Sequence, residues 1–177
     1  QHVYACRTCE HSEINTPIVT APKPKRPISG SYASPSAIAY VVDQKYVQGV
    51  PLHRQEQQLT RLGGNLSRQT LANWVLVATE RHLVPLYNHL HRRLLDQEVL
   101  HADETTVQVL QEPGRAAETK SYMWLYRTGR DGPPIVLFDY RPTRAGKHPI
   151  EFLSGFSGYL QVDGYAGYEG IPNVTLA

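Results

Sequence analysis

The chain has 177 residues, of which 41% are hydrophobic and 19% charged, with 18 basic and 16 acidic side chains. This composition is typical of a folded globular protein and excludes disordered and fibrous classes. No apolar run approaches the roughly 18 residues of a membrane-spanning helix, so we expect no membrane partner. Residues 1–6 form no apolar signal segment, and two cysteines three positions apart cannot build a disulfide framework. We therefore expect a cytoplasmic protein.

The net charge of +2 is unevenly distributed along the chain. Residues 1–97 carry 11 basic and 6 acidic side chains, whereas residues 98–177 carry 7 basic and 10 acidic ones. A basic region joined to an acidic one is typical of a polyanion binder with a cation-dependent site. Two unrelated surfaces with ordinary scatter would give the same numbers, so charge alone does not decide.

The first 33 residues divide into two zones. Residues 1–13 contain Cys6 and Cys9. Residues 14–33 are polar and rich in proline, and they carry Lys23, Lys25 and Arg26. Proline fixes φ and lacks an N–H donor, so this second zone is predicted to be an extended, semi-rigid basic linker.

Residues 34–97 have the apolar period of helices. Ser34, followed by proline, predicts the start of a first helix. A second helix is expected over residues 52–62, where a Gly-Gly pair ends it. A third follows the cap at Ser67, and a fourth follows Pro85. This region is predicted to be helical throughout.

The second and third of these helices are spaced as in a helix-turn-helix. In that interpretation Arg68, Gln69, Thr70 and Asn73 begin a recognition helix for DNA. A plain helical bundle, in which these polar side chains are only solvated, is the alternative that spacing leaves open.

From residue 98 the pattern changes to that of strands. We predict strands over residues 99–103, 122–127, 135–140 and 159–163, with a short helix near 149–153 before the last one. The expected fold is therefore α+β, a helical region followed by a partial mixed α/β sheet. A right-handed crossover can return the fourth strand parallel to the first. If these two strands are neighbours, Asp103 and Asp163 meet at adjacent carboxyl ends, where such sheets bind ligands.

Two carboxylates at strand ends suit a hard divalent cation, since Mg²⁺ is usually held by one or two carboxylates and phosphate oxygens. An aspartate at a strand end is also a common turn-former, so neither residue decides alone. Glu104 should face away from Asp103, because side chains alternate along a strand. Asp139 is a spare candidate. A basic loop with Arg141, Arg144 and Lys147 could hold phosphate, although solvated loop charge is the more common explanation of such a loop.

Several motifs occur in a fixed order along the chain. They are Leu-Ser-Arg-Gln-Thr-Leu-Ala-Asn-Trp at 66–74, His-Ala-Asp-Glu-Thr at 101–105, Thr-Lys-Ser-Tyr-Met-Trp at 119–124, Tyr-Arg-Pro-Thr-Arg-Ala-Gly at 140–146 and Leu-Gln-Val-Asp-Gly-Tyr-Ala-Gly-Tyr at 160–168. Together they resemble the insertion sequence 66 family of bacterial transposases. The similarity extends over nearly the whole chain, which makes it more specific than any single motif.

The resemblance implies a partial ribonuclease H-like catalytic domain of the Asp-Asp-Glu type over residues 98–177. It implies a helical DNA-binding region over 34–97 and a partial zinc-binding segment over 1–13. Asp103 and Asp163 would then be the first two metal-binding carboxylates. Mg²⁺ or Mn²⁺ would activate water, and then a DNA 3′-hydroxyl, for in-line attack on phosphodiesters.

By the same implication the partners are insertion-element ends and target DNA, and the full-length protein is a homo-oligomer. The residues expected to contact DNA are Lys23, Lys25, Arg26, Arg68, Gln69, Thr70, Asn73, Arg141, Arg144 and Lys147.

Two departures from the family pattern limit what we expect of this chain. The third carboxylate, a Glu on a helix well after Asp163, has no counterpart, and Glu169 lies too close to Asp163. Cys6 and Cys9 correspond to half of a four-cysteine zinc site. We therefore expect a transposase truncated at both ends, which is inactive alone. A non-catalytic DNA-binding module or remnant is the alternative.

Overall fold

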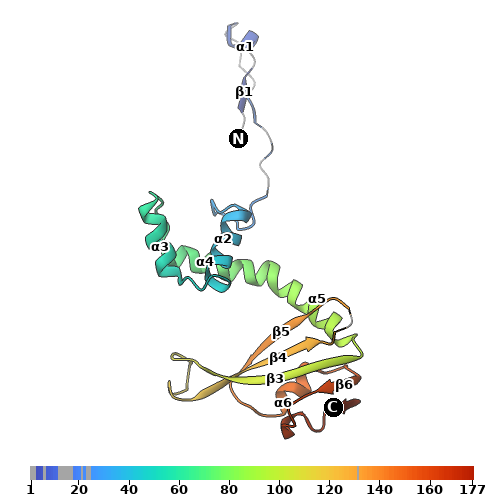
Figure 1. Ribbon diagram of the computed structural model, residues 1–177. Coiled ribbons are helices and arrows are strands. Elements are labelled where there is room, and N and C mark those ends of the chain that lie inside the picture. Colours follow the sequence, from blue (N-terminus) through green and yellow to red (C-terminus); the bar gives the residue numbers. More distant parts are fainter. Residues whose placement is uncertain (1–2, 6, 12–17, 21, 23–24, 131) are drawn as a thin grey trace. The chain divides into compact units, whose positions relative to one another are not determined.

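The computed structural model describes residues 3–5, 7–11, 18–20, 22, 25–130 and 132–177 (Figure 1). The chain divides into two compact units, residues 1–81 and 82–177. This division falls one helix earlier than the predicted boundary between residues 97 and 98, because the last helix packs its apolar side chains into the core of the sheet. The α+β class is confirmed.

The first unit is built mainly from three helices, α2 (Pro35–Tyr46), α3 (Leu52–Arg61) and α4 (Arg68–Ala78). Ser34 and Ser67 cap α2 and α4 as predicted, since each hydroxyl accepts a hydrogen bond from a backbone N–H three residues on. The buried core of these helices is Ile28, Ala33, Ile38, Val41, Leu71, Trp74, Val75 and Ala78.

Three short elements precede these helices: β1 (Val3–Ala5), α1 (Arg7–His11) and β2 (Ile18–Thr20). The strands β1 and β2 pair in antiparallel fashion. The sequence pattern did not predict this pairing, because three-residue strands are too short to show a period.

The second unit contains a five-stranded sheet with its helices. Its elements are α5 (Val84–Leu95), β3 (Val99–Gln108), β4 (Lys120–Thr128), β5 (Val136–Arg141), α6 (Lys147–Phe152), β6 (Gly158–Gln161), the 3-10 helix η2 (Ala166–Tyr168) and β7 (Val174–Leu176). A π-helical turn, η1 (Thr79–Leu83), precedes α5. The strand order is β5-β4-β3-β6-β7.

The strands β3, β4 and β5 form an antiparallel meander, and β6 returns parallel to β3 beside it (Figure 1). The parallel pairing of the first and fourth strands, which the sequence left as a possibility, is present in the structure. The bounds of all four predicted strands differ from the prediction by one to five residues, and two of these differences concern the candidate aspartates. β3 continues to Gln108 because the residues after Asp103 pair with β4, and β6 ends at Gln161, two residues before Asp163.

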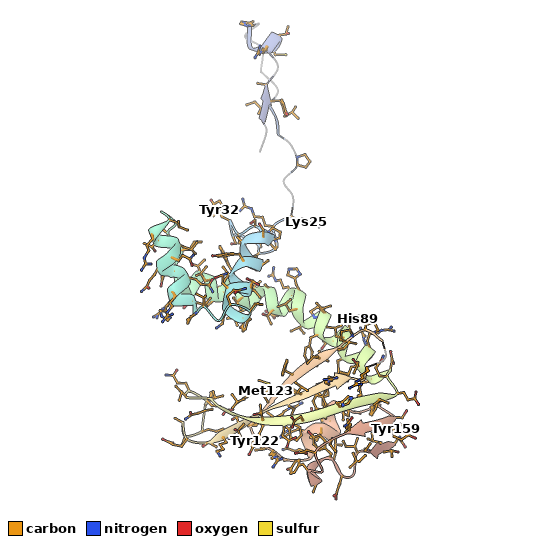
Figure 2. The ribbon with its side chains drawn as sticks, viewed as in Figure 1. Lys25, Tyr32, His89, Tyr122, Met123 and Tyr159 are labelled. Atoms are coloured by element: carbon orange, nitrogen blue, oxygen red, sulfur yellow. The ribbon has the colours of Figure 1, made fainter. Side chains whose placement is uncertain are left out.

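One face of the sheet is buried against α5 and α6. Tyr126 of β4 stacks on Phe152 of α6 with ring centres 3.9 Å apart, and Leu94 of α5 belongs to the same buried cluster. The opposite face is more exposed, and Phe138 keeps 56% of its surface accessible. In Figure 2 the labelled neighbours on β4, Tyr122 and Met123, lie on opposite sides of the sheet. No helix among the described residues is long and apolar enough to cross a membrane.

Candidate functional site

The predicted metal-binding carboxylates lie on two adjacent segments, but Asp103 is in the middle of β3 and not at its end as predicted, because the pairing with β4 continues beyond it. Across β3 and β6 the last paired residues are His101 and Gln161. Asp103 and Asp163 both follow this pair by two positions, so the topology brings the two segments to the same end of β6. Asp103 is within β3 and faces Leu125 of β4, whereas Asp163 is in the turn that follows β6.

Both carboxylates have oxygens open to a ligand. The Oδ1 of Asp103 accepts a hydrogen bond from the N–H of Glu104 at 2.8 Å, and the Oδ1 of Asp163 accepts one from the N–H of Tyr165 at 3.1 Å. Nothing in the described part of the chain donates a hydrogen bond to the second oxygen of either group. Asp103 also lines a shallow hollow of about 100 Å³, between β3, β4 and β5. These oxygen donors fit a hard divalent cation.

The described residues provide no third metal-binding side chain in a group with these two. Within the residues that the structure describes, no three His, Cys, Asp or Glu side chains gather in a group that could hold a metal. Two carboxylates are compatible with Mg²⁺, which commonly keeps water and phosphate oxygens as its other ligands.

Glu104 lies on the buried face of β3, as the alternation from Asp103 predicts. Its side chain is only 1% exposed, and Arg144 forms an ion pair with it. The hydroxyl of Tyr168 donates a hydrogen bond to Oε2 of Glu104 at 2.5 Å. Burial and, to a lesser degree, this hydrogen bond raise the pKa of Tyr168 far above its ordinary value, so the proton stays on the tyrosine.

The predicted phosphate-binding loop is largely neutralised within the protein. Arg141 donates hydrogen bonds to Asp139 at 2.6 Å and to Glu151 at 3.1 Å. Asp139, the spare catalytic candidate, is therefore an ion-pair partner in this structure. Arg144 pairs with Glu104. Lys147 is exposed at the start of α6, and no ion pair joins it to a described residue.

His148 is buried beside this loop, and a hydrogen bond of 2.7 Å joins its Nε2 to the hydroxyl of Thr143. Burial lowers the pKa of His148, and the positive charges of Arg141 and Lys147 lower it further. Folding therefore favours the neutral form of the His148 imidazole, compared with the unfolded chain.

In the first unit, the side chains predicted to read DNA lie at the start of α4. Arg68, Gln69 and Asn73 are exposed, while Thr70 is half-buried beside the Ser67 cap. Oε1 of Glu56, on α3, accepts a hydrogen bond from the backbone N–H of Arg68 at 2.9 Å. This link between the two helices was not predicted, since a glutamate in a polar helix gives no sign of its partner.

The remaining predicted residues lie near the chain start. Lys25 is exposed (Figure 2), and Arg26 donates a hydrogen bond to the carbonyl of Ser31 at 2.9 Å. Cys9 is half-buried on α1. Lys23 and Cys6 lie outside the described residues, so the zinc half-site stays a prediction.

The chain is an α+β protein in which a helical unit precedes a mixed sheet in the sequence, with Asp103 in β3 and Asp163 shortly after β6. Comparison of the sequence with models of known protein families shows that residues 30–177 match the Transposase IS66 family. The chain belongs to that family. A transposase-related function follows from this membership.

Three curated relatives come from Sinorhizobium fredii (strain NBRC 101917 / NGR234). The uncharacterized protein y4qI is 33% identical over 87% of this chain and 29% of its own length. The uncharacterized protein y4jD is 32% identical over 94% of this chain and 32% of its own length. The uncharacterized protein y4hP is 30% identical over 95% of this chain and 30% of its own length. The chain thus spans about a third or less of the length of these relatives. No solved structure matches it.

Sequence reasoning missed the contacts of Glu104 with Arg144 and Tyr168. The signal was present in part, because alternation along β3 placed a charged side chain on the buried face, where a charge requires a partner. The identity of the partners was not readable, since they lie 40 and 64 residues further along the chain.

Proposed function

We propose that this chain supplies part of a transposase active site, in which Asp103 and Asp163 hold a divalent cation for DNA strand cleavage and transfer. The observation that supports this most directly is the parallel register of β3 and β6, in which both aspartates follow the last paired residues, His101 and Gln161, by two positions. Family membership suggests DNA as the partner. Because the relatives are about three times longer, the complete reaction belongs to the longer protein.

In this proposal the residues of this chain bind the divalent cation and orient the two carboxylates that hold it. Asp103 is held by the pairing of β3 with β4, and Asp163 by its hydrogen bond to the N–H of Tyr165. Their unpaired oxygens would supply two ligands. Mg²⁺ or Mn²⁺, when bound, activates an attacking oxygen and stabilises the leaving one. A third carboxylate, if the reaction needs one, must come from outside the described residues.

We assign DNA contact to the exposed face of α4, with Arg68, Gln69 and Asn73. These side chains point away from the core formed by Leu71 and Trp74, so a duplex can reach them. Phosphate contacts from arginine release counterions and make binding dependent on salt.

The test of the metal site is Mn²⁺ binding to the 177-residue chain, measured by calorimetry. We expect Asp103→Asn and Asp163→Asn each to weaken binding at least about tenfold, which corresponds to about 1.4 kcal/mol. Asp96→Asn is the matched control, because Asp96 is an exposed aspartate at the end of α5, and its side chain is 67% accessible. Equal binding by all four proteins would contradict the assignment.

DNA binding is tested with the Arg68→Ala variant over a range of salt concentrations. We expect weaker binding and a salt slope reduced by about one, as for the loss of one phosphate contact. Arg130→Ala is the control, since Arg130 is exposed in the turn between β4 and β5. DNA binding without any Mn²⁺ binding would favour the second candidate, a DNA-binding module without catalysis. The lack of a third metal-binding side chain in the described part of the chain is what keeps that candidate open.

A further inference from the structure

Glu104 is an almost fully buried carboxylate that follows Asp103 directly in β3. A buried charge is stable only when it is paired and hydrogen-bonded. Arg144 donates to Oε1 of Glu104 through Nε at 2.7 Å and also through a terminal guanidinium nitrogen. Tyr168 donates to Oε2 at 2.5 Å. Both carboxylate oxygens are therefore used, and both partners come from segments near Asp163.

The contacts continue from Arg144 to Asp163. The guanidinium of Arg144 lies over the ring of Tyr165, 3.8 Å from its centre. The hydroxyl of Tyr165 donates to the carbonyl of Arg144 at 2.6 Å. The backbone N–H of Tyr165 in turn donates to the carboxylate of Asp163. A continuous chain of polar contacts thus joins Glu104 to Asp163.

The two loops in this chain of contacts approach each other closely. A Cβ placed on Gly146 would lie 2.6 Å from the carbonyl oxygen of Gly167. Both glycines lie within two residues of a member of the contact chain. The backbone beside Arg144 therefore packs directly against the segment that follows Asp163.

We propose that Glu104 is a positioning residue, which fixes the Asp163 turn relative to Asp103 through Arg144, Tyr165 and Tyr168. One strand then controls both aspartates, since Asp103 presents its carboxylate on one face of β3 and Glu104 anchors the Asp163 turn from the other. The metal-binding part of this inference rests on the proposed function. The ordering of the turn does not.

The chain provides a matched control at another place on the same sheet. Glu112 accepts a hydrogen bond from the hydroxyl of Tyr140 at 2.7 Å, and Arg115 lies 3.4 Å from its other oxygen. Like Glu104, Glu112 thus has an arginine and a tyrosine as partners, and the hydroxyl of Ser121 also donates to it at 3.1 Å. None of these contacts involves Asp163 or Tyr165.

The experiment compares Glu104→Gln and Tyr168→Phe with Glu112→Gln and Tyr140→Phe in the 177-residue chain. The first measurement is amide hydrogen exchange at Tyr165, which needs no metal. We expect exchange at least about fivefold faster in the Glu104→Gln and Tyr168→Phe variants, and unchanged in the controls. The second measurement is Mn²⁺ affinity, which we expect to fall about 10- to 100-fold in Glu104→Gln, as for other residues that orient a metal ligand.

The outcomes separate this inference from the metal proposal. Unchanged exchange at Tyr165 in both variants overturns the positioning role. Faster exchange without loss of Mn²⁺ affinity, in a parent that binds Mn²⁺, also overturns it. If the parent binds no Mn²⁺, the metal site is rejected, and exchange alone decides whether Glu104 orders the turn. Should Glu104→Gln fail to fold, Tyr168→Phe decides, because it leaves the ion pair with Arg144 in place.

Discussion

Two tyrosines of the second unit, Tyr126 and Tyr168, are completely buried, and their replacement by phenylalanine should change stability in opposite directions. The hydroxyl of Tyr126 has no hydrogen-bond partner among the described residues. Its ring stacks on Phe152 with an interplanar angle of 8°. The hydroxyl of Tyr168, in contrast, donates to the buried carboxylate of Glu104.

The magnitudes follow from what each hydroxyl does. A buried polar group without a partner costs about 1–3 kcal/mol, and phenylalanine removes that group while keeping the stacked ring. We expect Tyr126→Phe to stabilise the second unit by about 1 kcal/mol. A hydrogen bond to a charged group contributes about 1.5–3 kcal/mol, so Tyr168→Phe should destabilise the unit by about 2 kcal/mol.

The assay is urea unfolding followed by near-ultraviolet circular dichroism, with parent and both variants measured side by side. The free energies of unfolding of the two variants should differ by about 3 kcal/mol, well above the error of extrapolation for mutants with similar m-values. A Tyr126→Phe variant that is as unstable as Tyr168→Phe would refute the assignment of an unpaired hydroxyl at Tyr126.

Three further predictions concern other parts of the molecule. Burial lowers the pKa of His148, so the unfolded chain binds the proton more tightly than the folded protein, and stability should fall as the pH drops below about 6.5. In urea unfolding, the free energy of unfolding should decrease less between pH 7 and pH 5.5 in His148→Gln than in the parent. Gly158→Ala should destabilise the second unit severely, as judged by thermal unfolding, since its Cβ would lie 2.3 Å from the carbonyl oxygen of Glu98; wild-type stability would contradict the described β6 backbone. Ser67→Ala should cost the first unit about 1 kcal/mol by loss of the cap to the N–H of Thr70, and an unchanged midpoint in urea would argue against that cap.

Local features of the sequence predicted the order of the helices and strands from α2 to β6, with most bounds within two residues, but they did not predict the short strands β1, β2 and β7. Ser34 and Ser67 cap their helices as predicted, because a hydroxyl satisfies backbone donors within three residues. The alternation of side chains along β3 correctly placed Asp103 and Glu104 on opposite faces. These signals act over a few residues, so the sequence alone displays them.

The tertiary structure alone decided which distant segments meet. It placed β6 beside β3 in a register that aligns residues 60 positions apart, although the candidate aspartates had been identified beforehand from the strand ends and the family resemblance. It paired Arg141, a candidate for phosphate binding, with Asp139 and Glu151. It also gave Glu104 its partners on two later loops. Such pairings depend on where each crossover connection places the next strand and on which buried charges then form ion pairs. Neither can be read from a short stretch of sequence.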